Sequence, residues 1–441
     1  MPTAIEIFKH LPKKNCGKCN YPTCLAFAMQ LANSKARLED CPFISDEGKA
    51  ALAASSAPPI RLVRFGSDTR TIEMGDETEL YRHEKRFFHP TALAVTVSDS
   101  LALDEVRAQA RSIAAVSFER VGQTLRFDAL AVRDDSHDPA RFACAAQEAA
   151  KASGLPVILM SRSPEAMGAA AGALAPSRPL LHGADAANLE PMAAVAKQLS
   201  CPLALIEPEG LGAMADLAAR AKAAGVEDLV LDLGARGLKE QLERASVVRK
   251  LSVRKTFRGL GYPMMVDAGK GEGAVLKGMV AIMKYGGLVV FEELPEAQAL
   301  PLFVLRQNIY TDPQVPIQVK PGMYPVNGAR GDSPILFTTN FSLTYFTVLA
   351  DLEKSRAPAW LLVVDSEGLS VMTAFSAGKL TPEIVARALE SSAARERTSC
   401  DTLVIPGMVS RMSGKLMELT GLKVVVGPKE SSGLPKFMKG L

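Results

Sequence analysis

The sequence predicts an α/β protein that is built from three parts in chain order. Four cysteines lie within the first 42 residues, eight short apolar runs alternate with helical segments in the middle, and a second α/β pattern follows a proline-rich break. A chain of 441 residues is too long for one ordinary hydrophobic core, so several domains are expected. The prediction is a small cysteine-rich module, a central (β/α)8 barrel and a C-terminal Rossmann-like α/β domain.

The composition is that of a globular protein, with 48% hydrophobic and 22% charged residues. We find no apolar run long enough to span a membrane and no secretory signal, so we expect a cytoplasmic protein without a membrane anchor. Clustered cysteines in the cytoplasm bind metal more often than they form disulfides. The net charge of +3 is spread along the chain, which gives no indication of nucleic-acid binding.

The N-terminal part contains the most reactive stretch of the chain, CGKCNYPTC. Cys16, Cys19, Cys24 and Cys41 follow the spacing C-x2-C-x4-C-x16-C, and Pro42 follows the last cysteine. Structural zinc sites usually pair their cysteines as two separated C-x2-C knuckles, and the second knuckle is missing here. Cubane iron–sulfur clusters commonly take three thiolates from one loop and a distant fourth before proline. The spacing therefore favours a [4Fe–4S] cluster, with structural zinc or four unligated cysteines as alternatives.

The local sequence supports a thiolate site. The segment TCLAFAMQLANSKARL predicts a helix that is capped by Thr23. Cys24 then lies in the first turn, where the helix dipole favours a thiolate. The other three cysteines, Cys144, Cys201 and Cys400, are scattered in apolar surroundings and are predicted to be small core residues.

The central part follows residues 51–59, whose small, uncharged side chains and terminal prolines predict a linker. Eight buried strands that alternate with helices fit a (β/α)8 barrel better than an open sheet. The expected strands are ALAVTV at 92–97, FDALAV at 127–132, PVILM at 156–160, PLLH at 179–182, PLALI at 202–206, DLVLD at 228–232, PMMVD at 263–267 and GLVVF at 287–291.

Polar residues at the ends of these strands would lie at the C-terminal mouth of the barrel, where (β/α)8 barrels have their active sites. They include Asp232, Asp267, Glu292 and Glu293. No histidine, cysteine or basic residue visibly pairs with these carboxylates in the sequence, so solvation or helix capping is the simpler interpretation. The charged and aromatic stretch at 75–89 is either a docking arm for a partner or a solvated connector.

The C-terminal part begins after a second proline-rich break at 311–328. Strands are expected at 335–340, 361–365, 401–407 and 423–428, and a helix is expected from Pro382 with Thr381 as its cap. Ligands of open parallel sheets bind outside the carboxyl ends of the strands, so residues at these ends are candidates to face a ligand. The stretch at 367–375 is either a strand of a hairpin or a loop that leads into a helix.

Several functions are disfavoured for the C-terminal part. It contains no G-x-G-x-x-G, P-loop or nucleophile elbow, which argues against dinucleotide, ATP or serine-hydrolase chemistry. It also contains no histidine, because all five histidines lie before residue 183. A metal-centred ligand held here would therefore lack an imidazole from its own domain.

Several long segments of the chain resemble the large (gamma) subunit family of the corrinoid iron–sulfur proteins of the acetyl-CoA decarbonylase/synthase pathway. They are LPKKNCGKCNYPTCLAFAM, EMGDETELYRHEKRF, RQNIYTDPQVPI, TTNFSLTYF, DSEGLSVMTA and VVVGPKESSGLP. The resemblance covers essentially the whole chain. It implies a [4Fe–4S] cluster domain at 1–58, a TIM barrel with an N-terminal connector at 59–315, and a Rossmann-like cobamide (corrinoid) binding domain at 325–441.

The resemblance also implies the ligand residues. Cys16, Cys19, Cys24 and Cys41 would ligate the cluster, and the cobamide would be base-off, with no histidine below the cobalt. The expected cobamide contacts are Thr338, Thr339, Thr344, Tyr345, Gly368, Leu369, Ser370, Val371, Met372, Thr373, Gly407, Gly427, Ser432 and Gly433. For each of these residues taken singly, a capping or turn role is the alternative. No catalytic side chain is expected, because the chemistry would occur on the cobalt.

The function implied by the resemblance is that of a methyl carrier in the reductive acetyl-CoA (Wood–Ljungdahl) pathway. The chain would be a component of a corrinoid-dependent methyltransferase system. Its cob(I)amide would accept a methyl group from methyl-tetrahydrofolate or a related pterin and deliver it to acetyl-CoA synthase. The cluster would reduce oxidised cob(II)amide and so return it to the cycle.

The implied partners are the small subunit in a heterodimer, the methyl-tetrahydrofolate methyltransferase and acetyl-CoA synthase/CO dehydrogenase. Because one cobalt must reach several partners, we expect hinges in the linkers at 51–59 and 311–328. Two alternatives are a pterin-dependent methyltransferase that acts through its TIM barrel, and an iron–sulfur electron carrier without cobamide.

Overall fold

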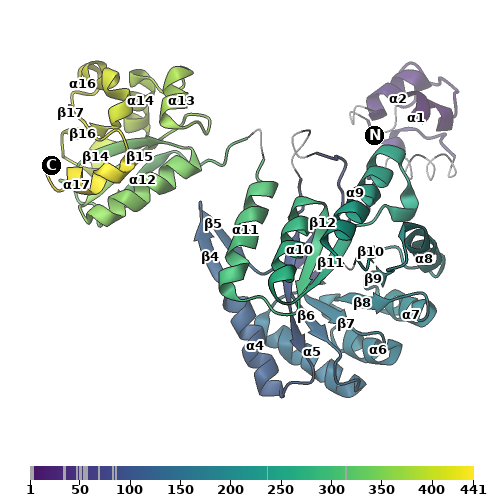
Figure 1. Ribbon diagram of the computed structural model, residues 1–441. Helices are drawn as coiled ribbons and strands as arrows, with labels where there is room; N and C mark the ends of the chain where they lie inside the picture. The colour runs from purple at the N-terminus through teal and green to yellow at the C-terminus, as the bar shows by residue number, and fades with distance from the viewer. Residues whose placement is uncertain are drawn as a thin grey trace. The chain divides into compact units, whose positions relative to one another are not determined.

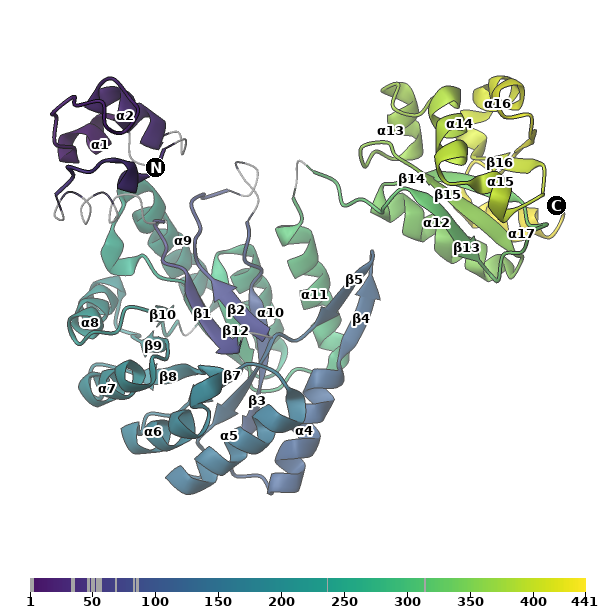
Figure 2. The same ribbon diagram turned by 180° about the vertical axis from the view of Figure 1, so that it is seen from behind.

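The computed structural model of the chain describes residues 4–32, 36–45, 48, 52, 58–67, 70–81, 84, 87–235, 237–312 and 315–441. The chain forms two compact units (Figures 1 and 2). The first unit comprises 1–80, 88–116 and 127–309, and the second comprises 81–87, 117–126 and 310–441. Within the predicted linker at 51–59, residues 51 and 53–57 lie outside the described residues.

The N-terminal module contains two short helices, α1 (Ala4–His10) and α2 (Cys24–Ala32). A 3-10 turn at Leu38–Asp40 follows them. Thr23 caps α2 as predicted, because its Oγ1 accepts a hydrogen bond from the N–H of Ala26 at 3.0 Å. The small core of the module comprises Ile7, Leu11, Cys19, Cys24, Phe27, Ala28, Cys41, Ile44 and Leu52.

The central part is a closed barrel of eight parallel strands, which confirms the predicted fold. The strand order is β10-β11-β12-β3-β6-β7-β8-β9. The strands are β3 (Ala92–Ser98), β6 (Ala129–Arg133), β7 (Val157–Met160), β8 (Leu180–Ala184), β9 (Leu203–Ile206), β10 (Leu229–Asp232), β11 (Met264–Gly269) and β12 (Gly286–Phe291). Each of the eight predicted apolar runs overlaps one of these strands.

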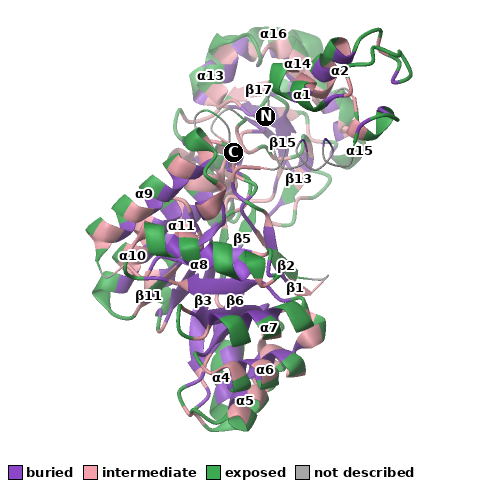
Figure 3. Ribbon diagram, turned by 90° about the vertical axis from the view of Figure 1, so that its right-hand side faces the viewer, coloured by how far each residue is buried: buried purple, intermediate pink, exposed green. Residues whose placement is uncertain are grey.

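Eight helices belong to the barrel in the described chain. They are α4 (Leu103–Ala115), α5 (Pro139–Ser153), α6 (Pro164–Ala173), α7 (Leu189–Leu199), α8 (Leu211–Ala223), α9 (Leu238–Lys255), α10 (Glu272–Met283) and α11 (Glu296–Tyr310). Figure 3 shows the strands buried and the helices with exposed outer faces. This distribution explains why the strands are continuous apolar runs while the helices are amphipathic.

Two hairpins were not predicted from the sequence. The first, β1 (Val63–Ser67) and β2 (Arg70–Met74), is antiparallel. Its Val63, Phe65 and Met74 belong to the same buried cluster as the inward residues of the barrel. The N–H of Gly66 donates to the carbonyl of Arg178, which precedes β8, so the hairpin packs where the strands begin. The second hairpin, β4 (Ser117–Arg120) and β5 (Gln123–Arg126), is inserted between α4 and β6.

The C-terminal part is a five-stranded sheet in the order β13-β15-β14-β16-β17. The strands are β13 (Gly322–Val326), β14 (Ile335–Thr339), β15 (Ala359–Val364), β16 (Thr402–Ile405) and β17 (Lys423–Val426). The last four are parallel, and β13 pairs antiparallel with β15 at the edge. The mixed α/β class is therefore confirmed.

Helices cover both faces of this sheet, as expected of a Rossmann-like fold. The helices are α12 (Ser342–Ser355), α13 (Val371–Ser376), α14 (Pro382–Ser391), α15 (Ala394–Arg397), α16 (Ser413–Thr420) and α17 (Leu434–Met438). One buried cluster joins the sheet to α13, α14 and α16, and another joins its opposite face to α12 and α17. Thr381 caps α14 as predicted.

The proline-rich break at 311–328 differs from its description as a linker, because it contains the edge strand β13. Pro325 is tolerated there, since edge strands do not need every N–H for pairing. The N–H of Val319 donates to the carbonyl of Asn340 at 2.8 Å, and the N–H of Ser342 donates to the carbonyl of Ile317 at 2.9 Å. Residues from Ile317 onward are thus part of the C-terminal sheet. The undecided stretch at 367–375 is a loop that leads into α13.

Within the described ranges, no helix combines the length and apolarity that crossing a membrane requires.

The packing of the barrel predicts opposite effects for one substitution at two helix glycines. A methyl group added at Gly278 of α10 would lie 2.6 Å from Cζ of Phe291, whereas at Gly168 of α6 its nearest neighbour would be Val195 at 3.6 Å. We expect Gly278→Ala to lower the free energy of unfolding of the barrel by about 1–3 kcal/mol, because the core is overpacked. Gly168→Ala is expected to raise it by up to about 1 kcal/mol through helix propensity. Thermal denaturation followed by circular dichroism measures both, and equal effects would contradict the packing.

Candidate cofactor sites

The four cysteines of the N-terminal module form no disulfide. Cys19, Cys24 and Cys41 are buried in the core of the module, whereas Cys16 is exposed. Asn15 orders the start of α2, because its Oδ1 accepts a hydrogen bond from the N–H of Cys24 at 2.8 Å. Its own N–H points at Sγ of Cys24, at 3.4 Å. Amide donors of this kind favour the negative sulfur of a ligating thiolate.

The loop that carries Cys16 and Cys19 is tightly wound. Lys13, Asn15, Gly17 and Asn20 all have positive φ, between 46° and 71°. In the described chain, no three side chains of His, Cys, Asp or Glu are grouped closely enough to hold a metal ion. The structure thus does not gather the four thiols into one coordination sphere. The types of donor, four reduced thiols and one amide N–H, are nevertheless those of an iron–sulfur site.

The other cysteines divide into three environments. Cys201 is buried, and burial raises the pKa of its thiol to about 11, so it is an uncharged core residue as predicted. Cys400 is half-buried. The prediction was wrong for Cys144, which is exposed on α5 because Phe142 and Ala145 belong to the face of that helix that packs on the barrel.

The C-terminal unit contains a cavity of about 430 Å³ at the carboxyl ends of β14, β16 and β17. The chain runs from β14 to β15 on one side and then crosses to β16 on the other side of β14. Such a reversal of strand order opens a crevice for ligands in α/β sheets. Of the predicted cobamide contacts, the cavity is lined by Thr338, Thr344, Ser370, Val371, Met372 and Gly427.

The strongest indication of a ligand is a pair of buried hydroxyl groups. Thr338 and Thr339 are 1% and 0% exposed, and their Oγ1 atoms have no hydrogen-bond partner among the described residues. Burying an unpaired hydroxyl costs about 1–3 kcal/mol. A buried polar group without a protein partner is commonly completed by an ordered water, an ion or a ligand. Of the two, Thr338 lines the cavity, so its unpaired hydroxyl points to a ligand with a polar group.

The remaining predicted contacts do not line this cavity. They are Thr339, Tyr345, Gly368, Leu369, Thr373, Gly407, Ser432 and Gly433. Tyr345 packs beneath the sheet against the rings of Tyr324 and Phe346, and burial raises the pKa of its hydroxyl. Gly407 allows close backbone contact, because a Cβ there would lie 2.6 Å from the carbonyl oxygen of Gly427.

Sequence reasoning missed several residues around the cavity. Lys429 is the one cation that lines it in the described chain, and Met408, which is 51% exposed, is at its rim. Both directly follow glycine or proline residues at strand ends, which is the signal that could have identified them. Asn340 was also missed as an organiser of the loop after β15.

Asn340 is 1% exposed and forms a hub of hydrogen bonds. Its Oδ1 accepts from the N–H groups of Ser366 and Gly368, both at 3.0 Å. Its Nδ2 donates to Asp365 at 3.0 Å and to Gln318 at 3.1 Å. Asn340 thereby fixes the loop that carries Ser370 to the cavity.

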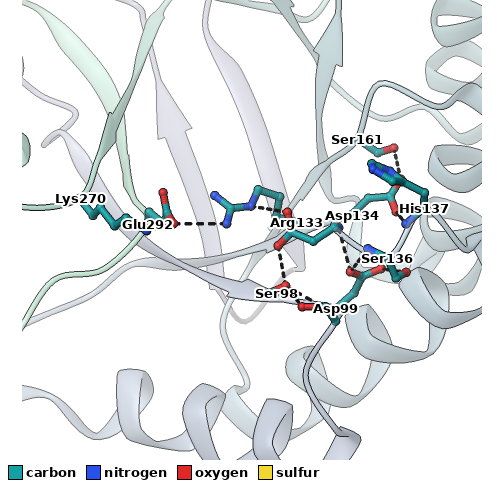
Figure 4. Close-up of polar contacts among 11 residues, drawn as sticks. Ser98, Asp99, Arg133, Asp134, Ser136, His137, Ser161, Lys270 and Glu292 are labelled. Atoms are coloured by element: carbon teal, nitrogen blue, oxygen red, sulfur yellow. Dashed lines mark hydrogen bonds and ion pairs between the residues drawn. The ribbon is translucent and has the colours of Figure 1, made fainter.

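Polar side chains at the mouth of the barrel form a network of their own (Figure 4). Glu292 bonds Lys270 at 2.9 Å and Arg133 at 3.5 Å, and these cations hold the pKa of its carboxyl below the usual range. Asp99 accepts hydrogen bonds from the backbone and hydroxyl of Ser136. The expectation that no histidine, cysteine or basic residue pairs with these carboxylates was wrong for Glu292 and for Asp232, which lies beside His182, because the partners are distant in sequence.

A second cavity, of about 410 Å³, lies beside β10 and β11 in the barrel. These two strands share only two paired positions among the described residues. Nε2 of His182 lies 3.0 Å from Oδ2 of Asp232, and both residues line the cavity. The sequence did not predict this pair, because its members lie on different strands.

The fold defines an α/β protein that contains a thiol-rich module, a barrel and a Rossmann-like domain with a cavity at its strand ends. Residues 62–438 match the family described as CO dehydrogenase/acetyl-CoA synthase delta subunit, and residues 11–43 match a family model for an Fe–S cluster. The chain belongs to the CO dehydrogenase/acetyl-CoA synthase delta subunit family.

Similar proteins span the whole chain. The corrinoid/iron-sulfur protein large subunit of Moorella thermoacetica is 43% identical over 439 residues, which cover 99% of this chain and 98% of that protein. The acetyl-CoA decarbonylase/synthase complex subunit gamma of Methanothermobacter thermautotrophicus is 35% identical, with 100% and 99% coverage. Among solved structures, dihydropteroate synthase from Thermus thermophilus is 18% identical with a TM-score of 0.39, and covers 57% of this chain and 100% of its own.

The unpaired hydroxyl of Thr338 leads to a prediction with two readouts. Thr338→Val keeps the shape and removes the orphan donor, so we expect the cofactor-free C-terminal unit to gain about 1–2 kcal/mol of unfolding free energy. Affinity for added cobamide is expected to fall about threefold to tenfold, because one hydrogen bond to the ligand is lost. Chemical denaturation and absorbance titration measure the two quantities.

Thr381→Val is the matched control for this experiment. Its hydroxyl caps α14 by accepting from the N–H of Ile384, so the control should lose about 1 kcal/mol and bind cobamide unchanged. A Thr338→Val variant that is both destabilised and unchanged in cobamide affinity would contradict a ligand role for this hydroxyl.

Proposed function

We propose that this chain is the corrinoid iron–sulfur methyl carrier of the reductive acetyl-CoA (Wood–Ljungdahl) pathway. The observation that carries the proposal is the strand-end cavity with the unpaired hydroxyl of Thr338, in a chain of which 99% aligns with a corrinoid/iron-sulfur protein large subunit. The carrier would accept a methyl group from methyl-tetrahydrofolate or a related pterin and pass it to acetyl-CoA synthase. It would work as one component of a multi-protein methyltransferase system.

The C-terminal unit would hold the cobamide. When bound, the cobamide supplies a cobalt centre that can take up and release a methyl group. The hydroxyls of Thr338 and Thr339 would bind polar groups of the corrinoid, and the apolar side chains of Leu343 and Val348 would exclude water. Residues 310–441 contain no histidine, which supports a base-off state without a protein imidazole on cobalt.

The N-terminal module would hold a [4Fe–4S] cluster through Cys16, Cys19, Cys24 and Cys41. Four thiols in a short module, with the N–H of Asn15 directed at Cys24, support this ligand set. The cluster would restore the active cofactor by a one-electron reduction. We propose that the parts at 1–58, 59–315 and 325–441 act as separate functional domains, with β13 joined to the last.

The partners proposed are a smaller subunit in a heterodimer, a methyl-tetrahydrofolate methyltransferase, and acetyl-CoA synthase/CO dehydrogenase. The similar proteins are named as a large subunit and as subunits of a complex, which supports assembly with other chains. The proposed location is the cytoplasm. A pterin-dependent methyltransferase that acts through the barrel ranks second, on the strength of the cavity beside His182 and Asp232.

The substitution Cys19→Ala tests the proposal that the cluster and the cobamide are held by separate domains. We expect the variant to lose the low-potential cluster signal in electron paramagnetic resonance while it still binds cobamide, because the two sites lie in separate units. Cys201→Ala is the control, since its buried neutral thiol should affect neither signal. Equal loss of cobamide and iron in Cys19→Ala would refute the modular assignment.

The base-off proposal predicts a spectrum. A protein imidazole on cobalt(II) would add a nitrogen nucleus that splits the axial cobalt lines in electron paramagnetic resonance. We expect no such splitting from the cobamide-loaded protein, and no change when each of the five histidines is replaced in turn. Splitting that vanishes with one particular replacement would identify a ligand and overturn the base-off assignment.

A further inference from the structure

The loop between α1 and α2 carries a one-sided charge distribution. The sequence has no Asp or Glu from Ile7 to Leu38, whereas Lys9, Lys13, Lys14 and Lys18 lie within that segment. All four lysines are exposed. The module therefore presents a positive surface to solvent, although the whole chain has a net charge of only +3.

Three of these lysines are positioned by aromatic rings. Nζ of Lys14 and Nζ of Lys18 lie 4.6 Å and 5.0 Å from the centroid of the Phe43 ring. Nζ of Lys13 lies 5.6 Å from the centroid of the Phe8 ring. No carboxylate of the described chain forms an ion pair with any of the three. We call Lys13, Lys14 and Lys18 the lysine collar; each lies near an aromatic ring, and no carboxylate of the described chain neutralises its charge.

The lysines of the collar flank an exposed thiol along the sequence. Cys16 lies between Lys14 and Lys18 and is exposed, whereas the other three proposed ligand cysteines are buried. An electron from another protein enters most readily where a redox centre lies nearest to the surface. The exposed edge of this module is therefore the part that carries the positive charge.

We propose that the lysine collar is the docking surface for an acidic one-electron carrier protein that reduces the iron–sulfur cluster. The inference rests on the proposed function, because it assumes that the module holds a redox-active cluster. In the step, one electron leaves the reduced iron–sulfur centre of the carrier and is gained by the cluster of this chain. No bond forms or breaks, and no proton is required.

The charge distribution indicates that the complementary surface belongs to another protein. Residues 325–441 of this chain contain thirteen Lys and Arg against eleven Asp and Glu, so the cobamide domain has no acidic excess to attract the lysine collar. Opposite charges steer the encounter of two proteins and raise the association rate by one to three powers of ten at low salt. That attraction weakens as ionic strength rises.

The test uses the full-length protein and a small acidic two-cluster ferredoxin as the probe. Stopped-flow absorbance measures the rate at which the reduced ferredoxin reduces the cluster, and isothermal titration measures their binding. For the unaltered protein we expect the rate to fall at least tenfold between low and high salt. The triple variant Lys13→Glu, Lys14→Glu, Lys18→Glu should be at least tenfold slower at low salt and nearly independent of salt, with weakened binding.

Two controls separate docking from damage to the module. The variant Lys151→Glu, Lys222→Glu, Lys439→Glu changes the net charge equally at exposed sites elsewhere, and should behave like the unaltered protein. Photoreduced deazaflavin, a neutral small reductant, should reduce the cluster of all three proteins at similar rates.

Equal slowing in both triple variants would overturn the proposal, as would an unchanged rate in the collar variant. Binding of a DNA duplex as tight as that of the ferredoxin would also overturn it, because the attraction would then be to any polyanion. Absence of a reducible cluster in the unaltered protein would instead refute the proposed function, and ferredoxin binding could still be measured.

Discussion

The reversal of strand order around β14 is the constraint on which the ligand site depends. Parallel strands need crossover connections, and a crossover to each side of β14 leaves a crevice at its carboxyl end that no connection covers. Thr338 and Thr339 end β14, and their buried Oγ1 atoms have no hydrogen-bond partner in the part of the chain that the structure describes. The side chain of Asn340, the next residue, fixes the neighbouring loop through four hydrogen bonds, two with Ser366 and one each with Gly368 and Asp365, and a fifth joins it to Gln318. The end of one strand therefore supplies both the unpaired hydroxyl of Thr338 in the cavity and the residue that orders the neighbouring loop.

Polar side chains at the strand ends have different partners in the two units. At the mouth of the barrel, Glu292 and Asp99 are paired with cations or hydroxyls of the protein itself. In the C-terminal unit, the buried hydroxyls of Thr338 and Thr339 have no hydrogen-bond partner among the described residues. This contrast is the physical reason for placing the cofactor in the C-terminal unit and for ranking barrel-based catalysis second.

The sequence allowed the fold to be predicted in detail where both faces of a strand are buried. Each barrel strand is a continuous apolar run, which is a strong local signal. The hairpins and β13 were missed because short or edge strands can include residues such as Pro325 that normally interrupt a strand. The carboxylate partners were missed because pairs such as Arg133 and Glu292 depend on barrel closure, which brings together residues 159 positions apart.

The residues of the two candidate cofactor sites were also predicted only in part. Cysteine spacing indicated four thiols whose role as cluster ligands stays a prediction, and the rule for strand ends indicated Thr338 and Gly427, which line the cavity. Lys429 and Met408 were not predicted, because their position depends on the path of the loops after β17 and β16.

The central claim, that the methyl group is carried on a cobamide in the C-terminal unit, is tested most directly by following a labelled methyl group. The reduced protein, with and without bound cobamide, is incubated with isotopically labelled methyl-tetrahydrofolate and a methyl-tetrahydrofolate methyltransferase, and the label retained by the chain is counted. We expect retention in proportion to bound cobamide and none in its absence. Equal retention without cobamide would show that the methyl group is not carried on the cobamide and would place methyl binding in the barrel.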